Sequence, residues 1–110
     1  MGRKSRELLP GTLDMLVLRT VSLARMHGYG IAQHIERISA DVIRVEKGSL
    51  YPALERLLRA GYVTAKWDRS PTGRRARYYT ITTSGRRLLG TEVSAFEAMY
   101  AAIARVLRTS

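Results

Sequence analysis

Residues 47–61 read KGSLYPALERLLRAG and carry the pattern of an amphipathic helix. Four leucines fall on one face when the segment is projected at the helical period: Leu50, Leu54, Leu57 and Leu58. Gly61 then predicts the end of the helix. Pro52 has no N–H to donate, and a first helical turn tolerates this because its N–H groups have no intrahelical acceptor. We therefore expect the helix to begin at about Gly48 or Ser49.

The opposite face of this helix differs in character. It presents Gly48, Ser49, Pro52, Glu55, Arg56 and Arg59, with Tyr51 at its flank. Small, hydroxylic and basic residues near a helix N-terminus suit a helix that approaches DNA end-on, where N–H groups and hydroxyls reach phosphates and bases. The alternative is a solvated face, on which Glu55 would pair with Arg59 at i, i+4 spacing.

The next residues predict a β-hairpin. YVTAKWD (62–68) and RYYTIT (77–82) alternate with period two, and they flank the turn sequence that runs from Ser70 to Arg75. The loop should hold about five to seven residues. We expect Trp67 to lie in the core, the alternative being a ligand platform. Tyr78 and Tyr79 are consecutive and should point to opposite faces.

Positive charge gathers on this hairpin. The chain has 19 Lys and Arg against 9 Asp and Glu, a net charge of +10. Residues 66–87 hold seven Lys and Arg and one Asp, so this segment alone carries +6. Like charges at a turn repel one another, so folding does not favour the cluster. It favours an anionic partner such as the phosphate backbone or the minor groove of nucleic acid; the alternative is a face that serves solubility.

Two helices are expected upstream. Apolar residues recur at helical spacing from Thr12 until His27-Gly28 stops the run, and Ile31, Ile35 and Ile38 mark a second, short helix. HGYG (27–30) should be the turn between them. Three helices followed by a hairpin predict a mainly α fold with a β-hairpin (α+β), a winged helix-turn-helix domain over residues 11–82.

The last segment, residues 83–110, should be one long helix from Thr83-Ser84-Gly85 to about Arg108. Its coiled-coil seam consists of Leu89, Val93, Phe96, Tyr100, Ile103 and Leu107. A second apolar stripe consists of Ala95, Met99, Ala102 and Val106. A domain of this size has little surface left to cover both stripes, so we expect a homodimer; the alternative is that both pack within one chain. A twofold dimer would present two helices to half-sites about one helical turn apart.

The sequence gives little support for other functional classes, such as enzymes or membrane proteins. His27 and His34 are the only histidines, they form no HExxH-like motif, and no glycine-rich phosphate loop precedes a helix, so we expect neither an enzyme nor a cofactor or metal site. Cysteine is absent. Without an apolar run of membrane-spanning length or a signal-type segment, a cytoplasmic protein is expected, with no membrane partner. Residues 1–10 should form a basic arm, with Arg3, Lys4 and Arg6 either solvated or contacting phosphate.

Four motifs resemble successive landmarks of the PadR-like transcriptional regulators. They are PGTLDMLVL (10–18), HGYGIAQHI (27–35), GSLYPALERLLRAGYV (48–63) and RRARYYTITTSGRRLL (74–89). The resemblance runs from about Pro10 to Leu89, and the short remainder is similar to the branch with a single C-terminal helix. It implies a homodimeric winged-helix repressor that binds double-stranded DNA.

The resemblance also implies roles for individual residues. Ser49, Tyr51 and Pro52 would lie in the recognition helix, and Tyr29 would lie on the neighbouring helix near the phosphates. The full DNA-binding set that we expect is Tyr29, Lys47, Ser49, Tyr51, Pro52, Arg56, Arg74, Arg75 and Arg77. Some family members bind apolar small-molecule effectors near the dimer interface, where this chain offers Phe96 and Tyr100 but no tryptophan. A winged-helix module that binds RNA or a protein is the alternative function.

Overall fold

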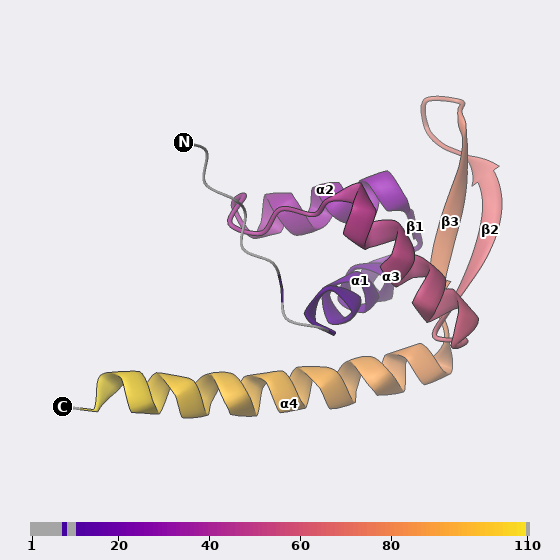
Figure 1. Cartoon of the computed structure of the whole chain (residues 1–110). Helices are drawn as coiled ribbons and strands as arrows, with labels where there is room; N and C mark the ends of the chain where they lie inside the picture. The colour runs from indigo at the N-terminus through magenta and orange to yellow at the C-terminus, as the bar shows by residue number, and fades with distance from the viewer. Residues whose placement is uncertain (1–7, 9–10, 110) are drawn as a thin grey trace.

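The computed structural model describes Leu8 and residues 11–109, which form four helices and a three-stranded sheet (Figure 1). Their order is α1 (Thr12–Leu23), β1 (Met26–His27), α2 (Gly28–Ile38), α3 (Lys47–Arg59), β2 (Val63–Arg69), β3 (Arg75–Ile81) and α4 (Thr83–Arg108). This order confirms the predicted winged helix-turn-helix with a long C-terminal helix. The basic residues of the predicted arm, Arg3, Lys4 and Arg6, lie outside the described residues.

The leucine face of α3 lies at the centre of the core. Leu50, Leu54 and Leu57 are at most 3% exposed and share one buried cluster with Leu18 of α1 and Ile31 of α2. Because burial of each such side chain stabilises the fold by roughly 1.5–3 kcal/mol, this face sets how α3 sits on the other two helices. The opposite face of α3 is left exposed, as the helical period predicts.

Only the C-terminal end of α3 lies where the sequence predicts it. At its C-terminus, Gly61 has φ +81°, its N–H donates to Leu58 O (3.1 Å), and the Tyr62 N–H donates to Leu57 O (2.9 Å). This is a Schellman motif, which turns the chain into β2. The N-terminus was predicted too late, because α3 begins at Lys47 and Pro52 therefore lies in the second turn. The proline leaves the carbonyl of exposed Gly48 without its i+4 donor, which water can replace.

The sheet contains a strand that sequence reasoning missed. β2 and β3 form the predicted hairpin, paired from Val63 with Ile81 out to Arg69 with Arg75, and β1 pairs with the other edge of β3. The prediction of HGYG as a simple turn was wrong, because His27 belongs to β1 and Gly28 opens α2. A two-residue strand has no periodicity of its own, and it forms here because β3 offers its backbone as a partner.

The prediction that Trp67 lies in the core was also wrong. Its side chain is 57% exposed, although Val63 and Ala65, on the same face of β2, are buried and half-buried. The hairpin extends past the helices, as Figure 1 shows, so alternation places Trp67 on the inner face at a point where no core remains. Tyr78 and Tyr79 do face opposite ways, and Tyr79 is the buried one.

Helix α4 packs on the domain through its first turns only. Leu89, predicted at the dimer seam, is 8% exposed and belongs to the core of its own chain, and half-buried Val93 packs against the same cluster. The remainder of α4 extends past α1 (Figure 1). It exposes Phe96, Met99, Tyr100, Ile103, Val106 and Leu107 by 48–79%. This long exposed apolar face is called the tail face below.

The start of α4 rests on a close approach at Gly85. A Cβ at this position would overlap the carbonyl oxygen of Tyr62 and lie 2.8 Å from Cγ1 of Ile81. We expect Gly85→Ala to lower the free energy of unfolding by about 1–3 kcal/mol, the range for overpacking a core. Urea denaturation followed by circular dichroism measures this loss.

Gly90→Ala is the matched control, since Gly90 is exposed in the same helix and a Cβ there would meet nothing within 4 Å. Its higher helix propensity should raise stability by about 0.5–1 kcal/mol. Equal stability of the two variants would show that the Gly85 approach does not constrain α4.

Candidate functional site

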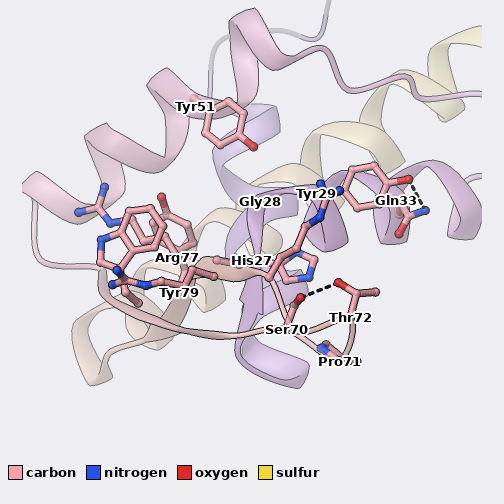
Figure 2. A pocket seen from close by; sticks show the side chains of 14 residues that line it. His27, Gly28, Tyr29, Gln33, Tyr51, Ser70, Pro71, Thr72, Arg77 and Tyr79 are labelled. Atoms are coloured by element: carbon pink, nitrogen blue, oxygen red, sulfur yellow. Dashed lines mark hydrogen bonds between the residues drawn. The ribbon is translucent and has the colours of Figure 1, made fainter.

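A groove of about 810 Å³ lies between the hairpin and the N-terminal ends of α2 and α3 (Figure 2). Its walls are His27, Gly28, Tyr29, Gln33, Tyr51, Trp67, Ser70, Pro71, Thr72, Arg74, Arg75, Ala76, Arg77 and Tyr79. Aromatic rings and guanidinium groups dominate this lining, and it holds no carboxylate. The groove is therefore a cationic surface with large flat apolar patches.

The start of α2 shapes one wall of the groove. His27 caps the helix, its Nδ1 accepting a hydrogen bond from the Gly30 N–H (3.0 Å). Tyr29 is 64% exposed, and its hydroxyl oxygen accepts a hydrogen bond from Gln33 Nε2 (3.0 Å). Because that oxygen accepts, the Tyr29 hydroxyl keeps its own proton to donate to a ligand.

Gly28 gives the tyrosine of α3 its place. A Cβ on Gly28 would lie 2.9 Å from Cε1 and 3.0 Å from the hydroxyl of Tyr51, so the ring packs where only glycine leaves room. Tyr51 remains 44% exposed toward the groove. Figure 2 shows its ring above Gly28, on the far side of the groove from Ser70, Pro71 and Thr72. A glycine and a tyrosine 23 positions apart thus form one wall.

The inner face of the hairpin forms the opposite wall, and it changes in chemistry along its length. Cross-strand pairing puts Val63 beside Ile81 at the base, Ala65 beside Tyr79, Trp67 beside Arg77, and Arg69 beside Arg75 at the tip. The same alternation that builds the core therefore places arginines and a tryptophan side by side where the strands leave it. Arg74 follows in the loop between the strands.

Arg74 and Arg75 are called the tip arginines below. No carboxylate within residues 11–109 pairs with Arg74 or Arg75. The guanidinium of Arg75 lies 5.4 Å from the centre of the Trp67 ring, at cation–π distance. Arg69 donates to the Gly73 carbonyl (3.1 Å) within the loop. The tip is therefore rich in positive charge that is still available to an anion.

Two other arginines of the predicted DNA-binding set, Arg56 and Arg77, form ion pairs with carboxylates of the same chain. Arg56 pairs with Asp14 of α1 (2.8 Å), and this hydrogen bond raises the pKa of the guanidinium. Arg77 lies 3.2 Å from Glu55, so Glu55 pairs with the hairpin and not with Arg59, the partner that the alternative interpretation gave it. The two pairs join residues 42 and 22 positions apart in the sequence, so helical spacing alone could not predict them.

The nine predicted DNA-binding residues divide into two groups. Tyr29, Tyr51, Arg74, Arg75 and Arg77 line the groove. Lys47, Ser49, Pro52 and Arg56 do not; they lie on the exposed face of α3, with Arg56 turned toward α1. Lys47 and Ser49 belong to the first turn of the same helix that contributes Tyr51 to the groove, whereas Arg56 lies near its C-terminal end.

A second ion pair holds the hairpin from its outer side. Arg25 lies 2.8 Å from Asp68, and its guanidinium lies over the Tyr78 ring, 4.4 Å from the ring centre. The hydrogen bond from Arg25 lowers the pKa of the Asp68 carboxyl. Burial raises the pKa of the Tyr79 hydroxyl on the inner side, against the opposing effect of Arg77. Sequence reasoning missed Arg25, because its contact with Asp68 spans 43 positions.

Other kinds of site are not found in the described part of the chain. Residues 11–109 contain no group of three His, Cys, Asp or Glu side chains arranged to hold a metal ion. None of the helices described there combines the length and apolar character needed to cross a membrane.

On the tail face, the rings of Phe96 and Tyr100 stack with centres 6.3 Å apart.

Comparisons with known proteins agree on one family. Residues 17–91 match the family model of the Transcriptional regulator PadR-like family. A PadR family transcriptional regulator from Eggerthella lenta is 27% identical, with a TM-score of 0.76 over 91% of this chain and 85% of its own.

Two further solved structures share the fold. A PadR-like transcriptional regulator from Bacillus cereus has a TM-score of 0.79 at 22% identity, over 91% of this chain and 95% of its own. A transcriptional regulator from Clostridium thermocellum has a TM-score of 0.78 at 23% identity, over 86% of this chain and 92% of its own.

The His27 cap can be tested by comparing two substitutions. His27→Ala removes the acceptor for the Gly30 N–H and should lower the free energy of unfolding by about 1 kcal/mol. His27→Asn supplies a side-chain oxygen at the same place and should recover most of that loss. Both variants lack the ring that contacts Tyr78, so thermal denaturation of the pair isolates the cap. Equal melting temperatures would contradict this role.

Proposed function

The chain belongs to the transcriptional regulator PadR-like family, and we propose that it acts as a homodimeric repressor on a pseudo-palindromic operator. Membership of this family makes the protein a DNA-binding regulator of transcription and favours DNA over RNA or a protein as the partner of its basic surface. The proposal adds which residues bind the duplex and how two chains act together.

One observation carries the proposal: Arg74 and Arg75, which pair with no carboxylate within residues 11–109, share a groove with the exposed tyrosines at the helix starts. Lys and Arg bind duplex DNA by neutralising phosphates and releasing counterions. Arg74 and Arg75 stand at the end of the hairpin, where they reach a phosphate backbone or enter the minor groove, whose negative potential attracts arginine. Their positions explain why the chain tolerates repulsion at this turn.

Helix α3 is assigned to base and backbone contacts beside the hairpin. Ser49, Pro52 and Lys47 are exposed near its N-terminus, where helix N–H groups and a hydroxyl favour an anionic partner. Glu46 provides no side-chain cap to occupy those N–H groups. Tyr51 and Tyr29 then contribute hydroxyl donors to flanking phosphates.

The two paired arginines act differently from the tip arginines. Glu55 accepts a hydrogen bond from Arg77 and thereby links the hairpin to α3. Asp14 holds Arg56 against α1. Surface ion pairs of this kind contribute about 0–1 kcal/mol, so phosphate competes easily for either guanidinium. We expect both to contribute less to affinity than Arg74 and Arg75.

The tail face supports the homodimer. It comprises six large apolar side chains on a helix that extends from the domain, and an exposed face of this kind is typical of a protein–protein contact. Pairing of two such helices about a twofold axis buries it, and the same axis places two α3 helices on successive turns of DNA. An apolar effector beside Phe96 and Tyr100 stays a prediction of the family resemblance.

The operator is tested by titrating the protein against its own upstream DNA and against an unrelated duplex, each at two salt concentrations. A specific regulator should prefer its operator by about a thousandfold or more. Arg74→Ala with Arg75→Ala should weaken binding to both duplexes and reduce the slope of log affinity against log salt by about 1–2 per chain.

Arg105→Ala with Arg108→Ala removes the same charge from the last turn of α4, away from the groove, and should leave that slope nearly unchanged. Equal affinity of the wild type for both duplexes would overturn the operator proposal. An unchanged slope in the Arg74 and Arg75 variant would show that the hairpin tip does not contact phosphate.

The dimer is tested by sedimentation. Phe96→Asp with Ile103→Asp places two charges on the tail face. Because these charges would have to lose their hydration when two helices pair, we expect the variant to sediment as a monomer. Ser94→Asp with Ala101→Asp introduces the same charges at the same spacing on the opposite face of α4, and this control should remain dimeric. Dimers in both variants would assign the interface to other helices.

A further inference from the structure

Trp67 is the only tryptophan of the chain, and it lies on the hairpin at a point beyond the core. Tryptophan carries the largest apolar side chain, and its burial normally contributes strongly to a core or an interface. Here more than half of the side chain is accessible to solvent. An exposed ring of this size on a hairpin that extends past the helices calls for a partner.

The position of Trp67 identifies the surface on which that partner would lie. Its ring lines the same groove as Tyr51 and Arg77, and its cross-strand neighbour is Arg77. It does not belong to the tail face, which lies on a different element. The partner that covers Trp67 is therefore the partner of the groove.

The charges around the ring indicate the chemistry of that partner. Arg75 lies over the ring at 5.4 Å, while Arg69 and Arg74 stand within two to seven positions of it on the same hairpin tip. A guanidinium at cation–π distance from an aromatic ring still has N–H groups directed away from the ring, and these are free to bind phosphate. A basic or neutral protein surface would not satisfy these groups, whereas the backbone of DNA offers both anionic phosphate oxygens and apolar deoxyribose edges.

We propose that Trp67 is a DNA-contacting residue of the hairpin, whose indole packs against the sugar–phosphate backbone while the neighbouring Arg75 binds the adjacent phosphate. This inference rests on the DNA surface proposed above. It assigns to the wing an apolar contact in addition to its charge, and the contact would hold the hairpin at a fixed depth on the duplex.

Fluorescence tests the contact directly, because every tryptophan signal comes from this side chain. Addition of operator duplex should shift the emission and reduce quenching by acrylamide at least about twofold, as expected when an exposed ring becomes covered. Raising the protein concentration without DNA should leave the quenching unchanged. Quenching that falls without DNA, or that does not fall with it, would overturn the proposal.

Affinity provides the second measurement. Trp67→Ala should weaken operator binding by about tenfold or more, the size typical of losing a large ring from an interface, while Trp67→Phe should retain most of the affinity. The salt slope of Trp67→Ala should stay parallel to that of the wild type, because the lost contact is apolar. A slope reduced by about one would mean that the ring acts only by holding Arg75, and it would overturn the direct contact.

Failure of this inference is distinguishable from failure of the DNA surface itself. If the wild type binds DNA and the Arg74 and Arg75 variant shows the reduced salt slope, but Trp67 stays equally quenchable, only the tryptophan contact is wrong. If the wild type binds no duplex, the proposed function fails with it.

Discussion

The structure depends on the junction where α3 ends and α4 begins. Thr82 Oγ1 donates to the Gly61 carbonyl (2.7 Å) and accepts from the Gly85 N–H (3.1 Å), while the Thr82 N–H donates to the Tyr62 carbonyl (3.0 Å). Gly85 has no side chain, so its backbone lies directly against Tyr62. These bonds satisfy polar groups at two helix ends and close the base of the hairpin in one place. The direction in which α4 leaves the domain is therefore fixed by backbone contacts.

This constraint connects the two surfaces that we assign to function. The DNA surface lies on α3 and the hairpin, the tail face lies on α4, and the junction joins all three elements within a few residues. A rigid connection matters because two half-sites on DNA tolerate little variation in the distance between paired recognition helices. The ion pairs of Arg77 with Glu55 and of Arg25 with Asp68 then hold the hairpin from its two sides. Each pair is weak, but together they limit its swing relative to α3.

The sequence predicts those parts of the fold that repeat with a regular period. The leucine face of α3, the hairpin and the extent of α4 follow from spacings of 3.6 and 2, and the basic hairpin tip follows from composition. The missed features depend on tertiary contact: β1 forms only beside β3, and Arg56 finds Asp14 from 42 positions away. Trp67 was misplaced because alternation gives the face of a residue but not whether the core extends that far. Leu89 was misplaced because a seam pattern does not reveal which part of it the same chain covers.

The assigned function therefore combines a shared fold with particular side chains of this chain. One side holds exposed tyrosines, one exposed tryptophan and tip arginines that pair with no carboxylate in the part of the chain that the structure describes, and another side holds an apolar helix. Hydroxyl-radical footprinting of the wild-type protein on its operator tests this combination most directly. The account predicts two equivalent protected regions related by a twofold axis, on one face of the duplex, with centres one helical turn (about 10–10.5 base pairs) or a whole multiple of it apart. A single protected region, or two regions on opposite faces of the duplex, would contradict it.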